Sequence, residues 1–222
     1  MHEVSMATGS RSGGGLTDDL GWRDNHAIFR THEGDTLMAT GKEHTDQHRP
    51  FALVGLAVTG IVAGAALGAL TNSINGWVSP LYFRNVLRWQ DVEDVWWASI
   101  AQGIFEGLLF GILLSLAFVI VAGIVSKARC GYRFGAAVLL AVVAAAFVCW
   151  MIGGLLGMGL AALSPEFFRH AFKGVPQDFA ELLRYAWVGG SITGIQFGGV
   201  AAMILGSFVF YARWQRRMGR ST

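Results

Sequence analysis

The chain has 222 residues, of which 53% are hydrophobic and only 14% are charged, and its formal net charge is +2. Soluble globular domains contain about 25% charged residues. The composition therefore excludes an ordinary water-soluble domain and indicates an integral membrane protein.

The first 49 residues form a polar N-terminal segment. They show no apolar periodicity and include the stretch GSRSGGG at residues 9–15. A segment with so little apolar surface cannot offset the entropy that ordering removes. We therefore predict that residues 1–49 are a disordered tail and that residues 50–222 form the membrane domain. No signal peptide is expected, because the first apolar run begins some 50 residues into the chain and is long enough to span.

Four long apolar stretches follow this tail. A helix needs about 20 mostly apolar residues to cross a bilayer, and long runs without alternation are unlike the strands of a membrane barrel. The sequence therefore predicts an all-α integral membrane protein with four transmembrane helices, at Phe51–Leu70, Ser99–Val125, Phe134–Leu163 and Val188–Tyr211.

The basic residues near the helix ends predict the orientation. The link between the second and third helices reads SKARCGYRF and the C-terminal segment reads ARWQRRMGRST, and neither contains an acid. The other two loops mix both signs. Because cytoplasmic loops carry an excess of Lys and Arg, we expect a multi-pass protein of the cell (plasma or inner) membrane. Both termini should be cytoplasmic, and both long loops external.

Three short phrases occur twice along the chain. The pairs are SPLYFR and SPEFFR, 85 residues apart, QDVEDV and QDFAEL, 87 apart, and GIFEG and GIQFG, 91 apart. A duplicated unit of helix, external loop and helix explains them. We predict two tandem helical hairpins, about 51–126 and 134–214, which form a parallel internal repeat.

Each Ser-Pro phrase predicts a short helix in an external loop. Serine favours the N-cap and proline the first helical turn. In the first copy Phe83, Val86 and Leu87 share one face, with Arg84 and Arg88 opposite. Such an amphipathic helix is expected to lie in the membrane interface.

Glycines four residues apart form a stripe on every predicted helix, with Gly153 and Gly157 on the third. Small residues at this spacing let helix backbones approach closely. The stripes predict either packing within the chain or a surface for a homo-oligomer or other membrane subunits. The residues are Gly60, Gly64, Gly68, Gly103, Gly107, Gly111, Gly190, Gly194 and Gly198.

Glu106 is the one ionisable residue well inside an apolar run. It follows Trp97 by nine residues, or roughly 13 Å of helix, and a charge at such depth costs about 2.5–3.5 kcal/mol. Gln102 shares its face, and Gln196, nine residues after Trp187, is its expected counterpart in the second hairpin. A neutral carboxyl that hydrogen-bonds neighbouring helices is one interpretation. A proton- or cation-binding carboxylate is the other.

The outer end of the first helix carries the polar stretch TNSIN at residues 71–75. Asn72 and Asn75 in it either complete a fraying helix end or face the helix of Glu106. We include Asn72 with Glu106, Gln102 and Gln196 in one candidate buried polar site.

No catalytic or metal-binding motif occurs in the sequence. We therefore expect no enzyme activity, no cofactor, no metal and no nucleic-acid partner, with the lipid bilayer as the main surrounding. The first functional hypothesis is a non-catalytic packing, assembly or accessory membrane subunit. The alternative is a small proton- or cation-conducting channel or transporter that uses Glu106.

Overall fold

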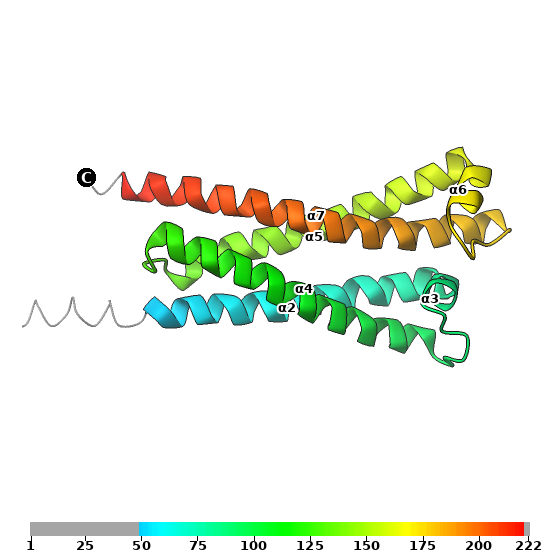
Figure 1. Ribbon diagram of the computed structural model, residues 1–222, viewed down its shortest axis with the longest axis horizontal. Coiled ribbons are helices and arrows are strands. Elements are labelled where there is room, and N and C mark those ends of the chain that lie inside the picture. Colours follow the sequence, from blue (N-terminus) through cyan, green and yellow to red (C-terminus); the bar gives the residue numbers. More distant parts are fainter. Residues whose placement is uncertain (1–48, 220–222) are drawn as a thin grey trace, which may run out of the picture. The chain divides into compact units, whose positions relative to one another are not determined.

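The computed structural model describes residues 49–219. The predicted disordered tail lies outside this range, apart from Arg49. The described part of the chain consists of helices and connections without strands (Figure 1). Its elements are α2 (Arg49–Val78), α3 (Pro80–Val86), α4 (Val95–Ser126), α5 (Tyr132–Leu163), α6 (Pro165–Ala171) and α7 (Phe179–Met218).

Four of these helices, α2, α4, α5 and α7, are long and apolar enough to cross a membrane. They coincide with the four predicted spans, and they indicate an integral membrane protein. The helices extend beyond the apolar stretches. α2 continues to Val78, and α7 begins at Phe179 and ends at Met218. The polar stretch at residues 71–75 is therefore helical.

The extension of α7 has a local cause. Asp178 caps the helix, and its Oδ1 accepts a hydrogen bond from the backbone N–H of Glu181 at 2.9 Å. A side-chain cap of this kind starts a helix wherever it lies, whether or not the following turn is apolar. Glu181 and Arg184, which precede the predicted span Val188–Tyr211, therefore belong to α7.

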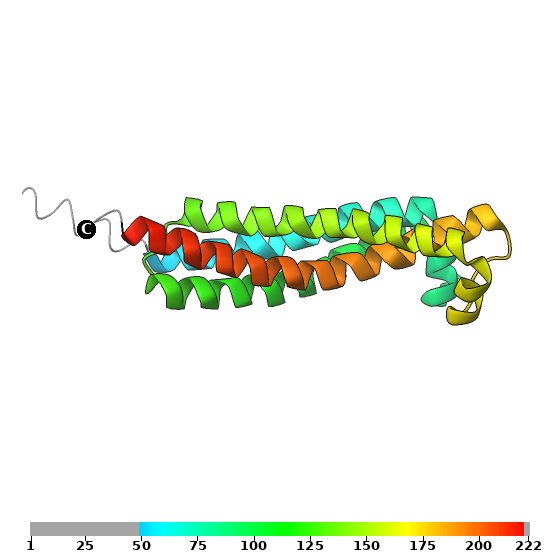
Figure 2. The same cartoon turned by 90° about the horizontal axis from the view of Figure 1, so that it is seen from above.

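The long helices pair as α2 with α4 and as α5 with α7. The connections that carry α3 and α6 lie at the same end of the bundle in both views, and the link from α4 to α5 lies at the other end (Figures 1 and 2). This is the arrangement of two hairpins in tandem that the sequence predicts.

Glycines hold each pair together at short range. A methyl group on Gly103 would overlap the carbonyl oxygen of Gly68, and one on Gly190 would overlap that of Gly153. Only glycine permits this approach of the two backbones. The predicted stripes of both hairpins therefore lie between the helices of each hairpin, with Gly198 against Cys149.

The glycine contacts of the two hairpins differ in register from the predicted repeat. Gly153 lies 85 residues after Gly68, and Gly190 lies 87 residues after Gly103. The expected equivalence of Gly103 with Gly194, from the phrases 91 residues apart, is thus wrong by one helical turn. By its register the counterpart of Glu106 is Thr193 rather than Gln196.

The short helices begin where the sequence predicts, with proline in the first turn of each. The serines before them, however, make no side-chain capping bond. Phe83 of α3 and Phe168 of α6 turn into the protein and are 1% and 7% exposed. Because these aromatic rings are buried in the bundle, both helices are packed against it rather than resting only on a membrane surface.

Candidate functional site between the hairpins

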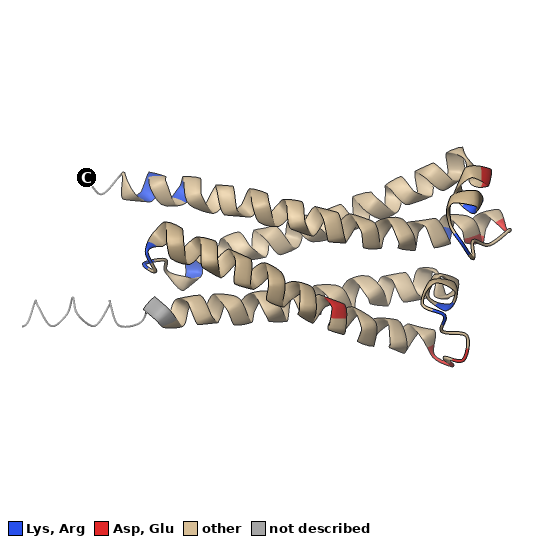
Figure 3. Ribbon diagram, viewed as in Figure 1, with Lys and Arg blue, Asp and Glu red and all other residues tan. Residues whose placement is uncertain are grey.

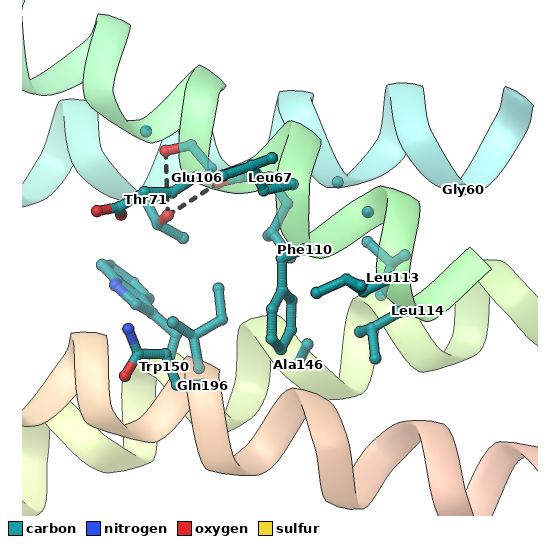
Figure 4. A pocket seen from close by; sticks show the side chains of 18 of the residues that line it. Gly60, Leu67, Thr71, Glu106, Phe110, Leu113, Leu114, Ala146, Trp150 and Gln196 are labelled. Carbon is teal, nitrogen blue, oxygen red and sulfur yellow. Dashed lines mark hydrogen bonds between the residues drawn. The ribbon is translucent and has the colours of Figure 1, made fainter. Parts of the chain in front are cut away.

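A cavity of about 300 Å³ lies between the two hairpins. All four long helices contribute to its wall, and most of the lining side chains are apolar (Figure 4). The polar side chains in the wall are Thr71, Asn72, Asn75, Glu106, Ser115, Trp150 and Gln196. Three of the four predicted site residues are therefore brought to one cavity, because Gln102 alone of them is outside the lining.

Glu106 lies on the wall that α4 forms, opposite Trp150 and Gln196 (Figure 4). Its Oε1 accepts a hydrogen bond from Nε2 of Gln102, one turn earlier in α4, at 2.7 Å. Gln102 thus positions the carboxyl without lining the cavity itself. Both Glu106 and Gln196 are exposed, so they form the edge of the cavity and not its interior.

Asn72 is buried between α2 and α4. Its backbone carbonyl accepts a hydrogen bond from Oγ of Ser99 at 3.1 Å, and its Cβ lies where a side chain at Gly103 would be. Asn72 therefore belongs to the packing of the first hairpin as much as to the cavity. The polar residues at 71–75 are part of a buried helix face, which decides against a fraying helix end.

Asn75 is fully buried and connects the two hairpins. Oγ of Ser191 on α7 lies 3.1 Å from Asn75 Oδ1, and it also lies 2.9 Å from the carbonyl oxygen of Val188. The other end of the amide, Nδ2, has no partner among the described residues. The sequence indicated Asn75 only through its spacing of three from Asn72, which puts both on one helix face.

Trp150 is a site residue that the sequence analysis missed. It is 3% exposed, lines the cavity from α5, and packs edge-on against Trp187 with ring centroids 5.5 Å apart. Its Nε1 has no acceptor among the described residues. A tryptophan inside an apolar run was a usable signal, because a buried indole N–H usually finds a partner.

The end of the cavity nearer the α4–α5 link is closed by aromatic packing. Phe118 and Phe210 are fully buried with ring centroids 5.5 Å apart, and Phe134 packs on Phe210 at 5.3 Å. The guanidinium of Arg217 lies over the Phe134 ring at 4.5 Å. The cluster of apolar side chains that contains these rings draws residues from α2, α4, α5 and α7 and so packs between the two hairpins.

The opposite end is closed by α3. Phe83 packs with Val95 and Val188 in one buried cluster, so α3 contacts both hairpins. The rings of Tyr82 and Tyr185 are 5.0 Å apart. Burial, reinforced by the nearby charge of Glu106, raises the pKa of Tyr82 above its ordinary value of 10.0. The phenol therefore stays neutral and contributes no charge at this end.

The remaining way into the cavity is from the side. The exposed lining residues are Glu106, Leu109 and Leu113 on α4 and Gln196 on α7. Leu109 and Leu113 are 49% and 65% exposed. The site is thus an apolar chamber closed at both ends, with a carboxyl and an amide beside a lateral opening. Such a chamber suits binding of an apolar molecule. Known protein families, curated proteins and solved structures provide no match to this chain.

Proposed function

We propose that the chain spans the plasma or inner membrane four times, with both termini in the cytoplasm. The end of the bundle that holds the α4–α5 link and the end of α7 carries basic side chains and no acidic ones among the described residues (Figure 3). The opposite end carries both signs. This segregation is what the positive-inside rule associates with the cytoplasmic side.

Within the membrane the protein acts as a non-catalytic accessory or assembly subunit that binds through its cavity and does not conduct. The observation that carries this proposal is the aromatic closure by Phe118, Phe134 and Phe210. A proton or cation path needs water or polar groups across the whole hydrocarbon region. Glu106 alone would leave the inner half without them.

Association with a further copy or with other membrane subunits is part of the proposal. The glycine stripes contact each other within the hairpins, so a partner is proposed on the outward apolar faces of the long helices instead. The shared register and the paired Ser-Pro helices also support our proposal that the two hairpins arose by duplication.

A proton- or cation-translocating protein is the second candidate. It is favoured by Glu106 itself, because an ionisable residue at membrane depth marks an ion pathway by default. In this version the aromatic closure opens during transport, and Gln102 holds the carboxyl toward the cavity.

Flux measurements in proteoliposomes separate the two candidates. A subunit that only binds gives no proton or cation flux above empty liposomes, and Glu106→Gln changes nothing because glutamine still hydrogen-bonds Gln102. Flux that is abolished by Glu106→Gln, while the variant unfolds at the same detergent concentration, would establish the translocating protein and overturn the first proposal.

A further inference from the structure

The chamber contains hydrogen-bonding groups that its own protein does not use. Asn75 and Trp150 line it, both are at least nine-tenths buried, and each has an N–H group without a partner among the described residues. A buried polar group that is left unpaired destabilises the folded protein. Two such groups in one apolar chamber point to a ligand that completes them.

The required chemistry follows from the atoms. The indole Nε1 of Trp150 can only donate a hydrogen bond, so the ligand must offer an acceptor oxygen there. The amide of Asn75 is held at Oδ1 by Ser191, and its Nδ2, without a partner among the described residues, belongs to a side chain that lines the chamber. The walls between these groups are leucine, valine, isoleucine, phenylalanine and glycine. The ligand is therefore mostly apolar, with very few polar atoms.

The depth of the site excludes a ligand with a charged head. Trp150 is 13 residues from the outer end of α5 at Leu163, which is roughly 20 Å of helix. That places its indole well inside a hydrocarbon core about 30 Å thick. Phospholipid carbonyls are tied to the interface by charged headgroups, because moving a charge to this depth is costly. The acceptor must belong to an uncharged molecule that dissolves within the bilayer.

The lateral opening supplies the remaining features. Leu109 and Leu113 provide an exposed apolar rim over which a long tail can leave the chamber into lipid. Gln196 stands at the same opening, and its side-chain amide can donate a hydrogen bond to a second oxygen of the head. The volume of about 300 Å³ suits a compact ring with its tail outside.

We propose that this chamber binds an isoprenoid quinone from the surrounding membrane. One carbonyl oxygen accepts from the indole of Trp150, the ring fills the chamber between the hairpins, and the isoprenoid tail passes Leu109 into lipid. The inference rests on the proposed membrane-embedded, non-conducting cavity, and it concerns binding alone.

Native mass spectrometry of the full chain in lipid nanodiscs tests this proposal. A short-tailed ubiquinone is titrated in, and bound copies are counted. We expect saturable one-to-one binding, and Trp150→Phe should weaken it about fivefold, since one net hydrogen bond contributes about 1 kcal/mol. Trp77→Phe is the matched control, because Trp77 is 79% exposed, and it should bind like the unmodified chain.

A second pair of variants changes exposed residues and leaves the buried core unchanged. Leu109→Trp narrows the opening at an exposed position and should reduce quinone binding at least tenfold. Leu160→Trp, at an exposed position on α5 outside the cavity lining, should leave it unchanged. The proposal would be overturned by unsaturable binding, by an empty chamber, or by a bound acyl lipid in place of quinone. It would also be overturned if Trp150→Phe and Leu109→Trp bound quinone as tightly as the unmodified chain. Because no flux is measured, its failure is distinguishable from failure of the non-conducting function.

Discussion

Two kinds of residue determine how the long helices of this bundle contact each other. Within each hairpin, glycines bring backbones together so closely that no side chain fits between them. Between the hairpins, larger side chains such as Phe110 and Trp150 keep the helices apart and enclose the chamber. The helices are therefore tightly packed within each hairpin, and the space between the two hairpins contains the cavity.

The glycine contacts predict a position-specific loss of stability. Gly103→Ala would press a methyl group into the carbonyl of Gly68, and overpacking of this kind costs about 1–3 kcal/mol. The free energy of unfolding, measured by SDS titration in mixed micelles, should fall by that amount. Gly159→Ala is the matched control, because a methyl group there meets nothing within 4 Å. Equal stability of the two variants would contradict the close approach.

Cys130 gives a prediction that depends on pH. It is 1% exposed, and burial raises the pKa of its thiol above the ordinary value of 9.0, although the Gly135 backbone and the charge of Arg217 oppose the shift. Only the thiolate reacts with maleimides. Alkylation of the folded protein should therefore be much slower at pH 7.5 than after unfolding in SDS, and should accelerate only above pH 9.

Mass spectrometry of the Cys130 peptide measures this rate of alkylation.

The raised pKa of the Cys130 thiol also means that the folded state holds the proton more tightly than the unfolded state. Stability from this group is therefore complete below pH 9 and declines as the pH rises through the folded pKa. Alkylation of the native protein at pH 7.5 as fast as in SDS would disprove the burial of this thiol.

At the scale of elements, the two short helices α3 and α6 each pack one buried aromatic ring against the long helices at the same end of the bundle. α3 places Phe83 between the hairpins and its ring stacks on Trp89 at 5.7 Å. α6 places Phe168 against Leu182 and Tyr185 of α7. A side-chain bond from Asn85 to the carbonyl of Gly174 joins the connection after α6 to α3.

Deleting these rings should destabilise the fold in proportion to their burial. Phe83→Ala and Phe168→Ala each remove a buried aromatic side chain, which costs about 3–5 kcal/mol. Phe167, beside Phe168 on the same helix, is 67% exposed, so Phe167→Ala should change the unfolding free energy by less than about 0.5 kcal/mol. A larger effect at Phe167 than at Phe168 would mean that α6 is docked by its other face.

The elements also show how far sequence reasoning reaches. Hydropathy located all four long helices, because a run of about 20 apolar residues has few alternatives. It could not locate the ends of α7, because Asp178 and the basic residues near Met218 extend the helix through polar turns. The predicted repeat shifted the glycines of α7 by one turn relative to the contacts in the structure, since glycines four apart match equally well after a shift of four. Contacts between backbones resolve that shift.

At the candidate site the prediction was partial for a similar reason. Glu106 and Gln196 were found because they are polar residues in apolar runs, and both do line the chamber. Their presumed equivalence by repeat was wrong, although the cavity places them on opposite walls (Figure 4). Trp150 was not found, because its role comes from an N–H that lacks an acceptor, and only the folded arrangement shows which donors are unpaired.

At the scale of the whole membrane domain, the cavity between the hairpins has two closed ends and a lateral opening. This shape is expected of a protein that binds a molecule and not of a channel. Phe118 and Phe210 close one end and Phe83 the other. The opening at Glu106 and Leu109 faces outward between α4 and α7. We propose that in a bilayer this geometry admits molecules from the lipid and excludes water from both sides.

Cysteine labelling in oriented proteoliposomes tests this central claim most directly. In a background that lacks Cys130 and Cys149, Leu114→Cys places a cysteine in the chamber, and Asp91→Cys places the control cysteine in the loop between α3 and α4. A membrane-impermeant, charged thiol reagent should modify the Asp91→Cys variant from one side only and should not modify Leu114→Cys from either side. Labelling of Leu114→Cys by this reagent would show an aqueous path into the chamber and contradict the account.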